Sequence, residues 1–411
     1  MRINIVICNN PFVASSASAN RWLTLIEGLS ELDVQIQMLV YGGYLSEYEM
    51  EKWGNQGENN QVSYKYIAPQ LMKGYIKLRY HAYLGSELRK KRLIKYIIGE
   101  LSEKDGIVWT DSSQFGFQLA TTIRKTMPQR LIFLEMSEFL DIHKYNKGNF
   151  LQRWKGERRQ KYFETKAFKA YDGIALMTKT LFEHYRAFPQ PLPKFLHLPM
   201  TVDLDRFEKT EVVPAEFIKP YIAFVGVMND AKDGVNILID AFSKLHRQFQ
   251  DYKLYLIGAW NYDTPAHLIA IKNLGLTDKV FWMKEYPRDR IPAIIKNADL
   301  LVLPRPDSKQ AQGGFPTKLG EYLATGNPVC ATTVGEIPEY LKDSESVYFA
   351  QPGSVDSFAD AMRRALSDPE EAKRIGAKGR KIAEIHFNKD IQAKKLFDFL
   401  ESLTNDHPTQ Q

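Results

Sequence analysis

A glycine-rich turn followed by a helix gives the clearest chemical pattern in the sequence, at GGFPTKLGEYLATGNPV, residues 313–329. Pro316 suits the first position of a helix, and the Gly-Asn-Pro that follows is typical of a helix end. Gly313 and Gly314 allow a ligand to approach the backbone closely just before that helix. Exposed N–H groups and the positive end of the helix dipole attract anions, so the segment predicts an anion site.

Two polar side chains lie on one face of the same predicted helix. Thr317 and Glu321 are four residues apart and therefore neighbours on the helix surface. A hydroxyl near phosphate groups and a carboxylate deeper along the face suit a nucleotide, with its ribose hydroxyls on the carboxylate. The alternative is an ordinary Gly-Pro loop before an amphipathic helix with a solvated Glu321, and these residues alone leave both interpretations open.

A second candidate segment is YIAFVGVMNDAKDGVNILIDAF, residues 221–242. Its apolar run predicts a strand that ends at Gly226, and a helix is expected to begin near Gly234 after a short polar loop. Lys232 lies in that loop, where an ammonium group can reach a pyrophosphate as a point charge. A loop lysine that faces water is the alternative.

The elements that must position these residues alternate between strands and helices along the whole chain. That order predicts parallel sheets flanked by helices, with ligands outside the carboxyl ends of the strands. We expect two Rossmann-like, doubly wound α/β domains facing across a cleft, at residues 1–200 and 201–386, with a boundary between Pro199 and Pro220. The predicted strands are Ile3–Cys8, Val34–Val40, Ile107–Thr110, Leu131–Glu135, Gly173–Met177, Phe195–Leu198, Tyr221–Val227, Lys253–Ile257, Val280–Met283, Leu300–Pro304, Val329–Thr332 and Val347–Ala350.

Composition restricts the class of protein. The 411 residues are 44% hydrophobic and 25% charged, which is ordinary for a globular protein with two cores. Only Cys8 and Cys330 are present, which excludes a disulfide framework and a four-cysteine zinc site. We see no signal peptide and no apolar stretch long enough to span a bilayer, so we expect a cytoplasmic protein.

Charge is distributed unevenly between the two halves. Residues 1–200 contain 28 Lys and Arg against 19 Asp and Glu, whereas the rest of the chain has a slight acidic excess. The segment Lys73–Lys95 alternates basic residues with Tyr, Leu and Ile at roughly helical spacing. Such a surface suits attachment to an anionic membrane; a pair of helices with one core face and a basic solvent face is the alternative. No nucleic-acid-binding module is recognisable, so we expect no nucleic-acid partner.

Taken together, residues 221–242 and 313–329 resemble the retaining GT-B glycosyltransferases of the family 4 type. The family's strand-end glycine, lysine and second glutamate of its Glu-x7-Glu motif match Gly226, Lys232 and Glu321. Its "G-x-PV" ending matches Gly326–Val329. Weaker matches are residues 171–185, 197–207, 254–258, 280–304 and 334–341.

The sequence departs from that family pattern at three positions. The first glutamate of the motif falls on Gly313, the arginine that often follows the strand glycine falls on Val227, and Asp233 is inserted between the lysine and the glycine. The Lys-Asp-Gly and Pro-Thr-Lys pattern indicates a variant subgroup. Arg305 or Lys318 is expected to supply the missing phosphate charge.

The resemblance implies a glycosyltransferase that moves a sugar, with retention, from a nucleotide-sugar donor to a glycan, lipid-linked or protein-linked acceptor. No cofactor or bound metal is expected, and a C-terminal helix at residues 387–404 should cross back onto the first domain. A nucleotide-sugar epimerase and a non-catalytic sugar- or lipid-binding scaffold are the alternatives. The implied donor-binding residues are Gly226, Lys232, Arg305, Gly313, Gly314, Phe315, Thr317, Lys318 and Glu321, of which Lys232 and Glu321 are also catalytic candidates.

The first domain is expected to bind the acceptor. The loop after its first strand, NNPFVASSASANR at residues 9–21, offers small and polar side chains, and our acceptor-binding candidates are Asn10, Ser15, Ser16 and Arg21. A flexible loop that caps the next helix is the alternative. In MSEFLDIH, residues 136–143, Glu138 is the nearest carboxylate to the point where the family often has a His-Asp pair, with Asp141 and His143 beyond it. Glu138 is therefore a further catalytic candidate, with a helix cap as the alternative.

Overall fold

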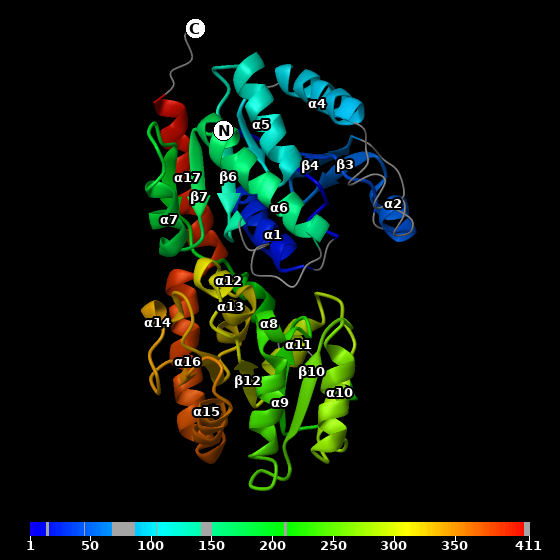
Figure 1. Ribbon diagram of the computed structural model, residues 1–411, viewed down its shortest axis with the longest axis vertical. Helices are drawn as coiled ribbons and strands as arrows, with labels where there is room; N and C mark the ends of the chain where they lie inside the picture. Colours follow the sequence, from blue (N-terminus) through cyan, green and yellow to red (C-terminus); the bar gives the residue numbers. More distant parts are fainter. Residues whose placement is uncertain are drawn as a thin grey trace. The chain divides into compact units, whose positions relative to one another are not determined.

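The computed structural model describes residues 1–13, 16–44, 46–67, 87–103, 105–140, 150–208 and 212–406. The chain divides into two compact units, which are described separately here (Figure 1). Unit 1 comprises Met1–Leu198 and Gln392–Gln411, and unit 2 comprises Pro199–Ile391.

Unit 1 is built on an eight-stranded sheet in the order β3-β4-β2-β1-β5-β6-β7-β8, in which only the β3–β4 pair is antiparallel. The strands are β1 (Arg2–Ile7), β2 (Gln35–Val40), β3 (Gln56–Asn59), β4 (Val62–Tyr66), β5 (Ile107–Thr110), β6 (Ile132–Met136), β7 (Gly173–Leu176) and β8 (Lys194–His197). Its helices are α1 (Ala17–Ser30), α2 (Glu47–Trp53), α4 (Glu87–Ser102), α5 (Gln114–Thr126), α6 (Phe150–Tyr162), α7 (Lys179–Arg186) and most of α17 (Lys389–Asn405).

Unit 2 is built on a six-stranded sheet in the order β11-β10-β9-β12-β13-β14, and all its strand pairs are parallel. The strands are β9 (Tyr221–Val225), β10 (Lys253–Ile257), β11 (Val280–Met283), β12 (Leu300–Leu303), β13 (Val329–Thr332) and β14 (Tyr348–Ala350). Its helices are α8 (Asp230–Asp233), α9 (Val235–Ser243), α10 (Thr264–Asn273), α11 (Ile291–Lys296), α12 (Lys309–Gly313), α13 (Thr317–Ala324), α14 (Ile337–Tyr340), α15 (Val355–Ser367) and α16 (Pro369–His386).

The predicted fold class is confirmed, because every expected strand is present in one of two parallel α/β sheets. The sequence analysis missed β3 and β4, which form a hairpin at one edge of the first sheet. Their two-residue turn, Asn60-Gln61, has positive φ at both residues, as a type I′ turn requires. The turn lacks the glycine that usually marks such a hairpin, and β3 is largely exposed and polar, so no apolar run indicated a strand.

Helix α17 completes the core of unit 1. Its buried side chains Ala393, Leu396, Leu400 and Leu403 belong to the same core as β1 and β5. Figure 1 shows α17, in red, beside β7, and a Cβ built at Gly173 of that strand would lie only 2.6 Å from Leu403. The absence of a side chain at residue 173 therefore allows the helix to pack closely on the sheet.

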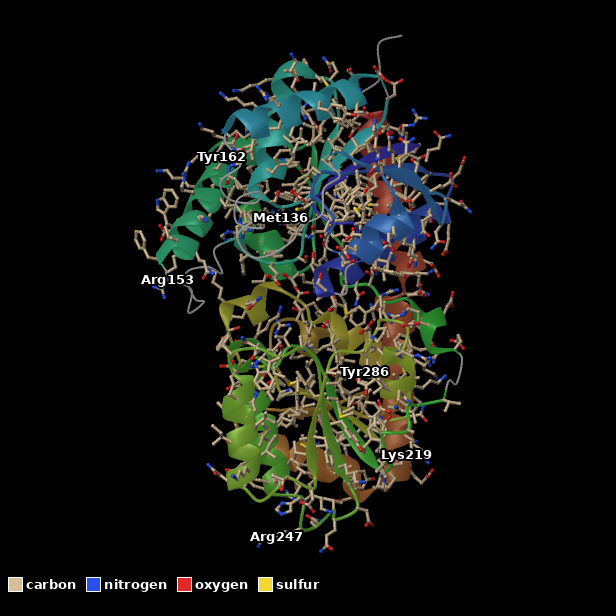
Figure 2. The ribbon with its side chains drawn as sticks, turned by 90° about the vertical axis from the view of Figure 1, so that its right-hand side faces the viewer. Met136, Arg153, Tyr162, Lys219, Arg247 and Tyr286 are labelled. Carbon is tan, nitrogen blue, oxygen red and sulfur yellow. The ribbon has the colours of Figure 1, made fainter. Side chains whose placement is uncertain are left out.

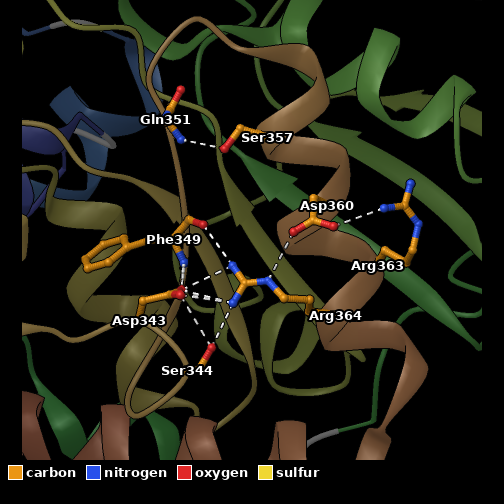
Figure 3. A network of polar contacts seen from close by, with 8 residues as sticks. All are labelled: Asp343, Ser344, Phe349, Gln351, Ser357, Asp360, Arg363 and Arg364. Atoms are coloured by element: carbon orange, nitrogen blue, oxygen red, sulfur yellow. Dashed lines mark hydrogen bonds and ion pairs between the residues drawn. The ribbon is translucent and has the colours of Figure 1, made fainter.

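In unit 2, one arginine fixes the edge strand β14 to helix α15 (Figure 3). The Arg364 guanidinium donates to the Asp343 carboxylate at 3.0 Å and to the Phe349 carbonyl at 3.0 Å. Asp343 in turn accepts the Phe349 N–H at 2.6 Å. This network satisfies backbone groups of β14 that have no further strand to pair with.

Among the residues that the structure describes, no helix is both long enough and apolar enough to cross a membrane.

The packing of α17 leads to a stability prediction. We expect Leu396→Ala to destabilise the protein by about 2–5 kcal/mol, because it leaves a cavity in a fully buried core. Ile391→Ala, on the same helix but at a position that is 48% exposed, should change stability by less than about 0.5 kcal/mol. Urea unfolding followed by tryptophan fluorescence measures both. Equal midpoints for the two variants would contradict the packing described above.

Candidate functional site

The strand order of unit 2 creates one natural position for a ligand. From β9 the sheet continues to β10 and β11 on one side and to β12, β13 and β14 on the other. The carboxyl ends of β9 and β12 are therefore adjacent where the strand order reverses, which is where ligands bind in open α/β sheets. The loops that follow β9 and β12, residues 226–234 and 304–316, lie within or lead into the two segments singled out from the sequence, residues 221–242 and 313–329.

The loop after β9 is more ordered than expected. Lys232 lies in the one-turn helix α8, where the sequence suggested a loop, and Asn229 caps this helix by accepting the Lys232 N–H at 2.8 Å. The imidazole of His267 contacts Asp230, the first residue of α8, at 2.7 Å. Gly234 ends the turn with φ of +67°, and a Cβ there would lie 2.1 Å from the Pro304 carbonyl. Only glycine permits this contact between the two loops.

Lys318, near the start of α13, reaches back to the end of β9. Its Nζ atom is 2.5 Å from Oδ1 of Asp233 and lies over the Phe224 ring at 4.6 Å from the centroid. A Cβ built at Gly226 would lie 2.2 Å from that nitrogen, so the strand-end glycine makes room for the ammonium group. The inserted residue Asp233 is thus the ion-pair partner of Lys318.

Positive charge exceeds negative charge around Lys318. Burial lowers its pKa, the Asp233 carboxylate raises it, and the charges of Lys232 and Arg305 lower it further. Arg305 is almost fully buried and donates to the Gln310 carbonyl at 3.3 Å. Lys232 and Arg305 thus add positive charge beside the Asp233–Lys318 pair, which favours an anion at this position.

Glu321 lies one turn along α13 from Thr317, and both residues are partly exposed. Its carboxylate accepts a hydrogen bond from Nη1 of Arg206 at 2.9 Å, and Nη2 of Arg206 donates to the Arg288 carbonyl at 2.8 Å. The sequence analysis did not identify Arg206. It falls within residues 197–207, which were noted only as a segment similar to the family.

The glycine-rich turn differs in detail from the expectation. Pro316 is the capping residue before α13 and not its first helical residue. The Gly314 N–H donates to the Gln310 carbonyl at 3.1 Å, at the end of the short helix α12 to which Gly313 belongs, so it is already engaged within the protein. Phe315 is buried, with its ring 5.1 Å from that of Phe387. Phe315 therefore anchors the turn by packing.

In unit 1 the strand order also reverses, between β1 and β5. A cavity of about 260 Å³ lies at the carboxyl ends of these strands. Five serines contribute to its lining: Ser16 and Ser18 at the start of α1, Ser112 and Ser113 after β5, and Ser137 after β6. The lining residues are Ile7, Cys8, Asn9, Pro11, Ser16, Ser18, Ala19, Trp22, Asp111, Ser112, Ser113, Glu135, Ser137 and Arg159.

Asp111 organises one wall of this cavity. Its carboxylate accepts hydrogen bonds from the Cys8 N–H at 3.0 Å, the Tyr41 hydroxyl at 2.8 Å and the Ser113 hydroxyl at 2.6 Å. Burial raises the pKa of Asp111, and the hydrogen bonds from Ser113, Tyr41 and Cys8 lower it in part. Burial and the Asp111 charge also raise the pKa of the Cys8 thiol to about 11, so the thiol is protonated at neutral pH.

The predicted acceptor residues have different positions. Ser16 lines the cavity and caps α1 by accepting the Ala19 N–H at 3.1 Å. Arg21 is buried, with its Nε 3.1 Å from Oε1 of Glu135, which does line the cavity. Asn10 is buried behind the loop and donates to the Tyr66 hydroxyl at 3.1 Å.

Only some of the other site residues predicted in unit 1 lie within the described residues. Glu138 is half-buried and does not line the cavity, although its neighbour Ser137 does. Ser15, Asp141 and His143 lie outside the described residues, as does most of Lys73–Lys95. Asp111 was not predicted as a site residue. Its run Asp-Ser-Ser directly follows a buried strand, just as the polar loop at residues 9–21 follows the first strand, so the same pattern could have indicated it.

Within the part of the chain that the structure describes, no group of three or more His, Cys, Asp or Glu side chains is arranged to hold a metal ion.

Comparison with known proteins agrees with this architecture. The family model "Glycosyl transferases group 1" matches residues 206–382. A GDP-mannose-dependent alpha-(1-6)-phosphatidylinositol monomannoside mannosyltransferase of Mycobacterium tuberculosis is 28% identical over 220 residues, which cover 51% of this chain and 56% of the relative. The chain thus spans about half the length of the curated relatives it matches.

Two solved structures share the fold over nearly the whole chain. Sucrose-phosphate synthase from Thermosynechococcus elongatus superposes with a TM-score of 0.77 at 15% identity, over 98% of this chain and 99% of that one. HepE of Anabaena, solved in complex with UDP, has a TM-score of 0.70 at 14% identity over 98% and 100%. The family match lies within unit 2, which is therefore similar to the glycosyl transferases group 1, and the chain has the GT-B fold of these solved structures, with a parallel α/β sheet in each unit.

Proposed function

We propose that the protein transfers a sugar from a nucleotide-sugar donor to a hydroxyl group of a glycan, lipid-linked or protein-linked acceptor, with retention of anomeric configuration. The observation that supports this most directly is the cluster of Lys232, Lys318 and Arg305 with Glu321 at the edge of the unit 2 sheet. Cations suit a pyrophosphate, and a carboxylate beside them suits the ribose hydroxyls. The family match in the same unit supports the same assignment.

The proposed chemistry needs stabilisation of a leaving group and no strong base. The bond between the anomeric carbon and the phosphate oxygen breaks, and a bond from that carbon to the acceptor oxygen forms. The acceptor proton passes to the leaving phosphate. Negative charge grows on the pyrophosphate as its bond breaks, so cations fixed nearby, such as Lys232 and Lys318, lower the barrier.

We propose that Asp233 and Lys318 account for two of the three departures from the family pattern, at Val227 and at Asp233 itself. The family's arginine after the strand glycine is absent here, and the residue at that position is the exposed Val227. We propose that Lys318, positioned by Asp233 at Gly226, supplies that charge from a different part of the chain. Thr317 and the start of α13 complete the phosphate side of the site.

For the acceptor we propose the serine-lined cavity of unit 1. Its hydroxyl groups suit hydrogen bonding to a polyhydroxylated molecule, and its buried charges Arg21 and Glu135 neutralise each other. Glu138, next to the cavity residue Ser137, remains the proposed acceptor-side carboxylate. The mycobacterial relative is named for a lipid glycoside acceptor, which makes lipid-linked acceptors a first choice for testing.

We also propose that unit 1 attaches reversibly to an anionic lipid surface. The excess of basic residues in the first half of the chain supports this, as does the lipid acceptor in the name of the relative. Each basic residue near such a surface contributes about 1 kcal/mol.

Removing the nucleotide contacts of unit 2 should impair donor use in two different ways. Glu321→Ala should weaken nucleotide binding about tenfold or more, because hydrogen bonds to a charged group contribute about 1.5–3 kcal/mol. Lys232→Ala should chiefly lower turnover. Calorimetry with nucleotide diphosphates and assays of sugar transfer separate the two effects. Glu345→Ala, an exposed carboxylate of the same unit, is the control. If both variants keep the wild-type nucleotide affinity and rate of sugar transfer, a non-catalytic sugar- or lipid-binding scaffold becomes the better hypothesis.

The pH dependence of donor binding tests the Asp233–Lys318 pair. Asp233 raises the pKa of Lys318, so Asp233→Asn should lower that pKa and the ammonium charge should be lost at a lower pH. Nucleotide affinity should then decline on the alkaline side at a lower pH than in the wild type. Asp240→Asn, on the exposed face of α9, should leave the profile unchanged. Coincident profiles for wild type and Asp233→Asn would remove Lys318 from the donor site.

Changes in the unit 1 cavity, or next to it at Glu138, should affect acceptor use alone. Ser112→Leu should fill part of the cavity and raise the acceptor KM, and Glu138→Gln should lower turnover. Nucleotide affinity should stay at the wild-type value in both. Nucleotide release with a panel of sugars and lipid-linked sugars is the assay. Parallel losses of nucleotide affinity and turnover would show that these residues act on folding or on the donor.

A further inference from the structure

Helix α6 is an exposed helix with an unusual surface. None of its 13 residues is buried. Phe150 is 78% exposed, Leu151 49% and Trp154 43%, all within its first turn and a half. Figure 2 shows the side chains of this helix, between the labelled Arg153 and Tyr162, pointing mostly away from the rest of unit 1.

The exposed apolar residues share one face with basic residues. Phe150, Trp154 and Arg158 follow one another at four-residue spacing, and Lys161 lies seven residues after Trp154, so all four side chains point the same way. The guanidinium of Arg158 stacks over the Trp154 ring at 4.7 Å. Five residues of α6 are basic and only Glu157 is acidic.

The C-terminal end of α6 attaches the helix to unit 1. The Tyr162 hydroxyl is 2.8 Å from the Thr121 hydroxyl of α5. The chain then continues into the core, where the Phe163 ring lies 4.7 Å from that of Phe117. The helix is thus fixed at its C-terminal end, while its aromatic and basic face remains exposed.

We infer that this face of α6 binds an anionic lipid bilayer. Interfacial helices combine aromatic and aliphatic residues that enter the headgroup region with Lys and Arg that contact phosphates. Phe150, Leu151 and Trp154 supply the first kind of contact, and Arg158 and Lys161 the second. The net positive charge of the helix is complementary to an anionic surface. This inference rests on the membrane attachment proposed above and assigns it to one helix.

Vesicle flotation tests the assignment with the full-length protein. Phosphatidylcholine vesicles with and without one third phosphatidylglycerol are the probes, at low salt. We expect binding only to the anionic vesicles. Arg158→Glu with Lys161→Glu should lower partitioning about tenfold or more, and Phe150→Ser with Trp154→Ser should also lower it. Unchanged thermal unfolding would establish that these surface variants fold.

Matched controls lie on exposed helix faces of unit 2. Lys373→Glu with Lys378→Glu changes the same charge on α16, and Ile269→Ser removes an apolar side chain that is 61% exposed on α10. Both should float as the wild type does. If all variants float equally well, the α6 assignment is wrong and membrane attachment stands. If the wild type does not bind anionic vesicles at all, the proposed membrane attachment and its assignment to α6 are both wrong.

Fluorescence gives a second readout that a purely electrostatic contact would not affect. Brominated lipids should quench Trp154 on binding, so the wild type should lose more emission than Trp154→Phe, which retains the other five of the six tryptophans. Equal quenching in the two proteins would contradict insertion of this face. Binding of a single-stranded oligonucleotide should also be measured. If the α6 variants lose oligonucleotide binding and keep vesicle binding, the surface binds nucleic acid and the inference is overturned.

Discussion

The reversal of strand order within each parallel sheet is the constraint on which the rest of this structure depends. In unit 2 it occurs between β9 and β12, and in unit 1 between β1 and β5. At such a point the connections from the two adjacent strands lead in opposite directions along the sheet, so the strand ends and the helix starts that follow them remain accessible. The charged cluster of unit 2 and the cavity of unit 1 both lie at these points. The topology thus selects where polar side chains can meet a ligand.

The two units use the same topology with different electrostatics. In unit 2, the charges of Lys232, Lys318 and Arg305 exceed that of Asp233. In unit 1, the buried Arg21 is paired with Glu135, and the Asp111 carboxylate is saturated by hydrogen bonds. An excess of positive charge favours an anionic group, whereas a neutralised cavity lined by serines favours hydroxyl groups. This difference is the physical basis for assigning donor and acceptor to different units in the proposal.

Close backbone contacts bring the parts of the unit 2 site together. Gly234 touches the carbonyl of Pro304, so the turn after β9 packs directly on the end of β12. Gly226 leaves the space that the Lys318 ammonium occupies, and Gly258 lies against the Gly226 carbonyl with φ of +158°. A side chain at Gly234 or Gly258 would push these backbone segments apart, and one at Gly226 would displace the Lys318 ammonium group. The glycines therefore contribute to the site through the distances that they permit.

The sequence by itself determined the elements and the local geometry of the motif. Buried apolar runs between polar loops predicted the strands, and helical spacing put Thr317 and Glu321 on one face, because both signals act over a few residues. It also indicated a resemblance to a family whose model matches residues 206–382. Only the tertiary structure decided the partners: Arg206 bonds to Glu321 across 115 residues of sequence, and Asp233 to Lys318 across 85. Such pairs depend on strand order and on the contact between loops, which no local pattern encodes.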